Sequence, residues 1–121
     1  MRVRLDLLRN PNAPGIARDR VEQAFRGSAG DRAVSDLMLV VSELVTNAIV
    51  HGVGPVSLTA QLIGPGIRVE VSDAGTGLSP TLLVQSKSTA GGHGLRLVDA
   101  LAVSWGVCVG KSCVWADMPV H

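Results

Sequence analysis

Two periodicities of hydrophobic and polar residues run along this chain. Near the N-terminus and in the middle of the chain apolar and polar residues alternate, which predicts strands because successive side chains of a strand point to opposite faces. Elsewhere apolar residues recur three and four positions apart, which predicts amphipathic helices. The expected elements are a strand over residues 2–8, a helix from 14 to about 26, a helix over 31–51, strands over 56–63 and 67–73, a helix over 94–102, and strands over 104–109 and 112–118.

Turn residues separate these elements and indicate how they connect. Gly52 closes the long helix, and Gly64-Pro65-Gly66 joins two strands as a hairpin. The polar stretch over 74–92 is rich in glycine and serine, and we expect at most one helical turn in it, near 80–84. This order predicts a two-layer α/β (α+β) sandwich with helices on one face of a mostly antiparallel mixed sheet, in a single domain of residues 1–121.

Composition narrows the function without naming it. Apolar residues make up 46% of the 121 residues and charged residues 17%, which excludes intrinsic disorder. A net charge of +1 gives no electrostatic footprint for nucleic acid or an anionic membrane. No apolar run reaches the length of a membrane span, and the alternating N-terminus is unlike a signal peptide. We therefore expect a soluble cytoplasmic domain.

The two cysteines, Cys108 and Cys113, flank a turn predicted at Gly110-Lys111 and are expected to face each other across a hairpin. They form no CxxC pattern and have too few histidine neighbours for a zinc site. In a chain without a signal peptide we expect both to stay reduced, as small apolar side chains.

The long predicted helix carries polar rows beside its apolar stripe. Ser42 and Thr46 form one row four residues apart, and Glu43 and Asn47 form a second that His51 extends by another turn. A helix this apolar is expected to be largely buried, so a carboxylate and a carboxamide on one face require a polar cavity beside them. The alternative is a polar stripe that faces solvent.

Asp73 falls in the core-facing phase of its strand, in line with Ile67, Val69 and Val71. A carboxylate in that position must find hydrogen-bond donors. Either it caps a turn, or it accepts a hydrogen bond from an amine of a ligand. The glycine-rich residues that follow it, Ala74 to Gly77, would let the backbone pass close to another group.

Gly91-Gly92-His93-Gly94 precedes an apolar helix. Glycines that open a helix leave free backbone N–H groups at its positive end, where anions bind. A flexible loop that caps the helix is the alternative interpretation.

The order and spacing of these features resemble a known superfamily. Glu43-Leu-Val-Thr-Asn47-Ala-Ile-Val-His51 is similar to the N box of the GHKL (histidine kinase/HSP90-like) ATPases, Asp73-Ala-Gly75-Thr-Gly77 to their G1 box, and Gly92-His93-Gly94-Leu95 to their G2 box. The segments VVSELVTNAIVHG and GLRLVDALAVSWGV further resemble anti-sigma-factor serine/threonine kinases and actinobacterial single-domain ATP-binding regulators. The fold that this resemblance implies is an α/β sandwich that binds ATP between its helical layer and a mobile lid.

The resemblance also implies which residues hold the adenine. Asp73 would accept a hydrogen bond from the adenine 6-amino group, and Gly75 and Gly77 would let the base approach the backbone. The family often has a threonine on its last strand near the adenine. Either Ser112 or Cys113 corresponds to it in this chain.

For the phosphates, the resemblance implies Asn47 as the ligand of Mg²⁺ and Glu43 as the general base that activates the attacking hydroxyl or water. Lys87, the only cation in a short lid over 78–91, would contact a phosphate. The remaining cofactor-binding residues that the boxes imply are His51, Gly92, His93, Gly94 and Leu95.

The function that the resemblance implies is a regulatory serine/threonine kinase. It would use ATP and Mg²⁺ to phosphorylate an anti-anti-sigma (STAS-type) partner, could sequester a sigma factor, and could form a homodimer. Because the lid is short and phosphoryl transfer depends on positioning, a non-catalytic module that binds ATP or ADP and controls a protein contact is the alternative.

Overall fold

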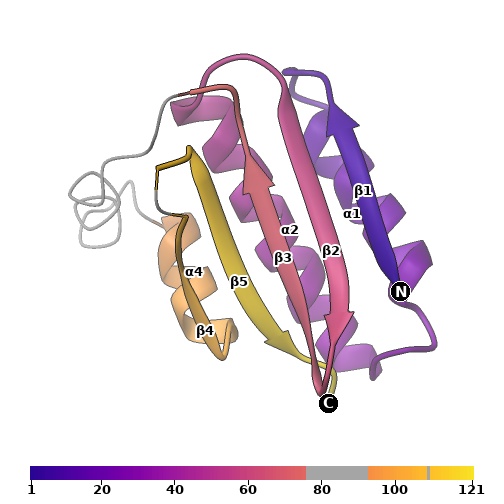
Figure 1. Cartoon of the computed structure of the whole chain (residues 1–121). Coiled ribbons are helices and arrows are strands. Elements are labelled where there is room, and N and C mark those ends of the chain that lie inside the picture. Colours follow the sequence, from indigo (N-terminus) through magenta and orange to yellow (C-terminus); the bar gives the residue numbers. More distant parts are fainter. Residues whose placement is uncertain (76–92, 109) are drawn as a thin grey trace.

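The computed structural model of the chain describes residues 1–75, 93–108 and 110–121 (Figure 1). Its elements are β1 (Arg2–Leu7), α1 (Ala13–Phe25), α2 (Asp31–His51), β2 (Val56–Ile63), β3 (Gly66–Ser72), α4 (His93–Leu101), β4 (Ser104–Val107) and β5 (Cys113–Pro119). The helical turn expected near 80–84 lies outside the described residues. Every other predicted helix and strand is present, with ends within two residues of the prediction.

The five strands form one open sheet in the order β1-β2-β3-β5-β4, and all four pairings are antiparallel. The hairpin between β2 and β3 closes at the pair Ile63–Gly66, and Gly64 takes the positive φ of 56° that this tight turn requires. All three described helices lie on the same side of the sheet (Figure 1). The predicted two-layer sandwich is therefore confirmed.

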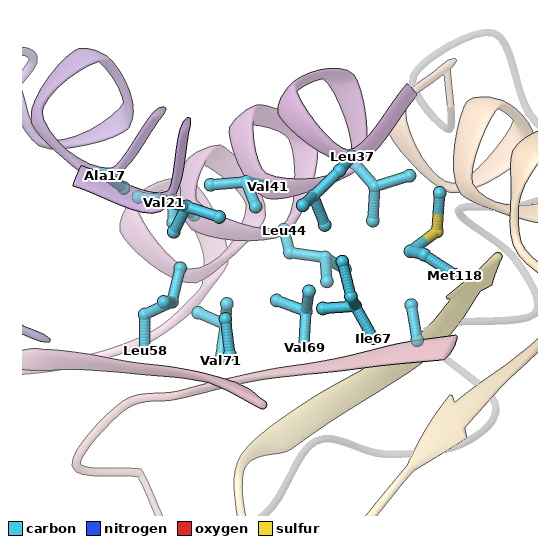
Figure 2. Close-up of a cluster of buried hydrophobic side chains, with 14 of the residues drawn as sticks. Ala17, Val21, Leu37, Val41, Leu44, Leu58, Ile67, Val69, Val71 and Met118 are labelled. Carbon is cyan, nitrogen blue, oxygen red and sulfur yellow. The ribbon is translucent and has the colours of Figure 1, made fainter. Parts of the chain in front are cut away.

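The core lies between α2 and the sheet (Figure 2). Val41 and Leu44 of α2 point toward β2 and β3, where Leu58, Val69 and Val71 supply the opposing surface. By length and composition alone α2 could cross a membrane. Its apolarity has another explanation in this fold, because burial of apolar area against a sheet is the main stabilising contribution of a core helix. The buried residues of α2 are Ala33, Val34, Leu37, Val40, Val41, Leu44 and Val45.

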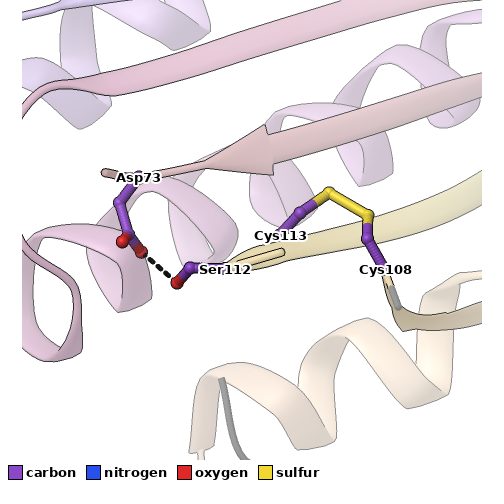
Figure 3. The surroundings of a disulfide bond; sticks show 4 residues. All are labelled: Asp73, Cys108, Ser112 and Cys113. Atoms are coloured by element: carbon purple, nitrogen blue, oxygen red, sulfur yellow. Dashed lines mark hydrogen bonds between the residues drawn. A yellow bond between two sulfur atoms is a disulfide. The ribbon is translucent and has the colours of Figure 1, made fainter. Parts of the chain in front are cut away.

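Cys108 and Cys113 are joined by a disulfide bond, so the expectation that both stay reduced is wrong for this structure (Figure 3). The turn between β4 and β5 brings their Cα atoms to 5.2 Å, within the usual range for a disulfide, and the Cys108 N–H donates to the Cys113 carbonyl at 3.0 Å. The sequence had indicated that the two residues face each other. The error was to let the expected reducing compartment outweigh that geometry.

Candidate functional site

The Asp73 carboxylate lies at the end of β3, between the C-terminal end of α2 and the start of β5 (Figure 3). The Ser112 hydroxyl donates to Asp73 Oδ2 at 2.7 Å, and the Gly75 N–H donates to Oδ1 at 2.7 Å. A longer bond of 3.4 Å joins the Val53 N–H to Oδ1. In return, the Asp73 N–H donates to the Ser112 carbonyl at 3.0 Å, so the two residues are linked twice.

These contacts bear on both interpretations of Asp73. The bond from the Gly75 N–H is the turn-capping contact that a carboxylate makes two residues ahead of itself, so the turn is real. It uses only part of the carboxylate, because two oxygens can accept about four hydrogen bonds. Asp73 is half-buried, and its hydrogen-bond donors in the described part of the chain are all neutral. Acceptor capacity for a ligand amine therefore remains.

Two glycines make room for this carboxylate. A Cβ at Gly52 would lie 2.3 Å from Asp73 Oδ2 and 2.5 Å from the Ala48 carbonyl oxygen. A Cβ at Gly75 would lie 2.8 Å from Asp73 Oδ1. The sequence singled out Gly75 as a place where a ligand approaches the backbone and Gly52 only as the end of a helix. In the structure both glycines are packed against Asp73 itself.

Asn47 and Glu43 lie one turn apart on α2 and are both half-buried. The Asn47 Nδ2 atom is fully buried and has no hydrogen-bond partner among the described residues. Unsatisfied buried amides are rare in folded proteins, and each requires an explanation. This atom favours the polar cavity over the solvent-facing stripe. His51, the last residue of α2, is exposed, as is Thr46 on the neighbouring row.

Sequence reasoning missed Arg9, which follows β1. Its guanidinium donates to three backbone carbonyls: Gly54 at 2.9 Å, Ala48 at 3.0 Å, and Ile49. Two of these carbonyls belong to the last turn of α2, where the helix dipole favours a cation. The Ala48 carbonyl also accepts from the Gly52 N–H at 3.0 Å. No periodicity or motif marks this arginine, because its partners are backbone atoms 39 to 45 positions away in the sequence.

A family model for the histidine kinase-like ATPase domain matches residues 9–116, nearly the whole chain. The chain belongs to this family. The superfamily inferred from the three boxes is thereby confirmed, and ATP is the ligand that membership of an ATPase domain family implies. A search of curated proteins found no match.

Within this histidine kinase-like ATPase domain, the expected phosphate-binding residues are only partly described. Helix α4 begins at His93, one residue before the start predicted at Gly94, so Gly94 is its second residue. The Leu95 side chain is buried and packs in the hydrophobic core. Gly77, Lys87 and Gly92 lie outside the described residues.

Ser112 and Cys113 were the two candidates for the position where the family often has a threonine near the adenine. Their contacts in this histidine kinase-like ATPase domain differ. Ser112 contacts the Asp73 carboxylate, while Cys113, the first residue of β5, is bonded to Cys108. The side chain of Cys113 is buried, and its sulfur is in the disulfide, so it has no thiol to offer a ligand. Of the two, Ser112 is the residue with a hydroxyl at the Asp73 site.

Proposed function

We propose that this domain is a regulatory serine/threonine kinase that binds ATP with Mg²⁺ and transfers the γ-phosphoryl group to an anti-anti-sigma (STAS-type) protein. The observation that carries the proposal is the Asp73 carboxylate, held by neutral donors at the junction of α2, β3 and β5 in a chain of the histidine kinase-like ATPase family. The arguments for the adenine, the phosphates and the partner rest on different residues.

For the adenine, we propose that Asp73 accepts a hydrogen bond from the 6-amino group and that Ser112 supports it. A carboxylate that already accepts from a hydroxyl and an amide is fixed in orientation, so it is preorganised for one more donor. A purine with an oxygen in place of the 6-amino group would place a hydrogen-bond acceptor next to the Asp73 carboxylate, which is also an acceptor. We therefore expect selectivity for adenine over hypoxanthine or guanine.

For the phosphates, we propose Asn47 as a ligand of Mg²⁺ and Glu43 as the general base. The amide nitrogen of Asn47 is buried and has no partner among the residues that the structure describes. Such a group fits a site where an anionic or hydrated ligand completes its hydrogen bonding. Its oxygen is the kind of hard ligand that Mg²⁺ prefers, and the bound ion would neutralise charge on the phosphates. Glu43, one turn earlier and half-buried, could take a proton from the attacking hydroxyl.

The partners follow from the resemblance of the N box and of the segment from Gly94 onward to anti-sigma-factor kinases. We propose a STAS-type protein as phosphoacceptor, a sigma factor as a second partner, a homodimer as the assembly, and the cytoplasm as the location. Each of these statements can fail while ATP binding holds.

One experiment tests the kinase against the non-catalytic alternative. The purified domain, γ-labelled ATP, Mg²⁺ and STAS-type proteins from the same organism are incubated together, and phosphoserine is located by mass spectrometry. Transfer to a serine supports the kinase. ATP binding without transfer to any of these proteins, and without ADP formation, would instead support a module that controls a protein contact by nucleotide binding alone.

A further inference from the structure

The loop that follows α2, residues 52–54, contacts Asp73. Backbone atoms of this loop hold the carboxylate, because the Val53 N–H donates to Asp73 Oδ1 and Gly52 packs against Oδ2. The Val53 carbonyl also accepts from the Ala74 N–H at 2.8 Å. Residues 52–54 therefore help to position the Asp73 carboxylate, beside the shorter bonds from Ser112 and Gly75.

Arg9 fixes that loop to the helix before it. Its Nε donates to the Gly54 carbonyl at 2.9 Å, beyond the loop residues that contact Asp73. Its two terminal nitrogens donate to Ile49 and Ala48 on the last turn of α2. A single planar guanidinium thus spans the helix end and the loop, and the rigid fork of donors in arginine suits such bridging better than the point charge of lysine.

The same contacts reach the phosphate end of the site. Ala48, whose carbonyl Arg9 binds at 3.0 Å, directly follows Asn47. Arg9 therefore ties the helical turn that carries Asn47 to the loop that holds Asp73.

We propose that Arg9 is a positioning residue that sets the distance and orientation between Asp73 and Asn47, and hence the preference for adenine. This inference rests on the proposed function of the Asp73 site. Arg9 acts through backbone carbonyls and touches no nucleotide. Its loss should release residues 52–54 from α2 and loosen the carboxylate, while the core between α2 and the sheet keeps the fold.

The test compares ATP with inosine triphosphate, which carries an oxygen in place of the 6-amino group, by calorimetric titration with Mg²⁺. In Arg9→Met we expect ATP affinity to fall roughly tenfold, about 1.4 kcal/mol, and affinity for inosine triphosphate to fall less, so that their ratio moves toward one. Arg9→Lys keeps the positive charge but lacks the planar set of guanidinium donors. It should shift the ratio of the two affinities in the same direction. If the loss of Arg9 affected only the stability of the fold, the affinities for ATP and inosine triphosphate would fall by the same factor.

Arg18→Met is the matched control, because Arg18 donates to the Ser42 hydroxyl at 2.8 Å and, within the described ranges, makes no hydrogen bond to the 52–54 loop. We expect this variant to keep the wild-type ratio. A wild-type ratio in Arg9→Met would overturn the inference. If Arg9→Met does not fold, a wild-type ratio in Arg9→Lys would overturn it as well.

Amide hydrogen exchange separates this inference from the proposed function. If the wild-type domain binds neither nucleotide, the proposed function fails, and the positioning of Asp73 is then judged on the protein alone. Faster exchange of the Val53, Ala74 and Gly75 amides in Arg9→Met than in Arg18→Met would support the positioning role. Equal exchange in the two variants would contradict it.

Discussion

The Ser112 hydroxyl donates a hydrogen bond to the Asp73 carboxylate at 2.7 Å, and the Asp73 N–H donates back to the Ser112 carbonyl at 3.0 Å. This double link joins the end of β3 to the residue before β5. It is formed one residue beyond the last ladder pair of the two strands, Ser72–Cys113. Side chain and backbone together therefore fix the edge of the proposed adenine site.

Ser112→Ala removes the side-chain half of this link. We expect a loss of about 0.5–1.5 kcal/mol in the free energy of unfolding, the usual net contribution of such a bond, measured by urea denaturation without nucleotide. ATP should also bind more weakly, because Asp73 would be less well oriented. Ser57→Ala is the control, since its hydroxyl reaches the exposed Asp6 only at 3.4 Å. A Ser112→Ala variant as stable as Ser57→Ala would contradict the importance of the link.

Gly52→Ala places a Cβ where there is no space for one. The new atom would lie 2.3 Å from Asp73 Oδ2 and 2.5 Å from the Ala48 carbonyl oxygen. We expect destabilisation of about 1–3 kcal/mol, typical of overpacking, in urea denaturation. Gly15→Ala, in α1, meets only the end of the Arg18 side chain at 3.6 Å and should stabilise the protein by up to about 1 kcal/mol through helix propensity. Two variants of equal stability would refute this account of Gly52.

Asp117 gives the stability a predictable dependence on pH. A hydrogen-bonded ion pair with Arg68, at 2.8 Å, holds the pKa of Asp117 below its ordinary value of 3.8. Its contribution to stability is therefore present above about pH 4 and is lost as the pH falls further, through the lowered pKa of the folded state. Because both side chains are more than a third exposed, the effect is small.

Asp117→Asn tests the predicted direction of this pH dependence of stability. In urea denaturation at pH 7 and pH 3, the variant should be less stable than the wild type at pH 7 and should lose less stability between the two values. Asp6→Asn removes the carboxylate of a more exposed pair with Arg4, at 3.5 Å, and serves as the control. Parallel pH profiles for wild type and Asp117→Asn would show that the pair with Arg68 contributes nothing.

Glu43→Ala separates binding from chemistry. If Glu43 is the general base, we expect ATP affinity to change little and phosphoryl transfer to be lost, by about a hundredfold or more. Calorimetric titration measures the first and phosphoserine formation the second. A variant with full transfer activity would remove Glu43 from that role.

Much of the fold was predictable because the period of the hydrophobic residues and the turn residues indicate the same boundaries for the helices and strands. The long helix begins and ends where Asp31 and Gly52 indicated, and β3 buries Ile67, Val69 and Val71 on one face. The phase of that strand also identified Asp73, since a carboxylate in an apolar register must have donors nearby. Local patterns sufficed for these features.

The missed features depend on contacts between distant segments. Arg9 binds backbone carbonyls, which have no side-chain signature in a sequence. The choice between Ser112 and Cys113 depended on the residue at which β5 begins, because a shift of one residue reverses which side chain faces Asp73. The pairing of the cysteines required the geometry of the turn to be weighed above the expected compartment.

Asp73→Asn tests the central claim, that this carboxylate binds the adenine of ATP. Asparagine has one acceptor oxygen in place of two, so the Gly75 N–H and the adenine amine would compete for it, while a donor would face the Ser112 hydroxyl. Calorimetric titration with ATP, with and without Mg²⁺, should show Mg²⁺-dependent binding to the wild type. It should also show a loss of about 1–3 kcal/mol in the variant. Equal ATP affinity in a folded Asp73→Asn variant would contradict the account.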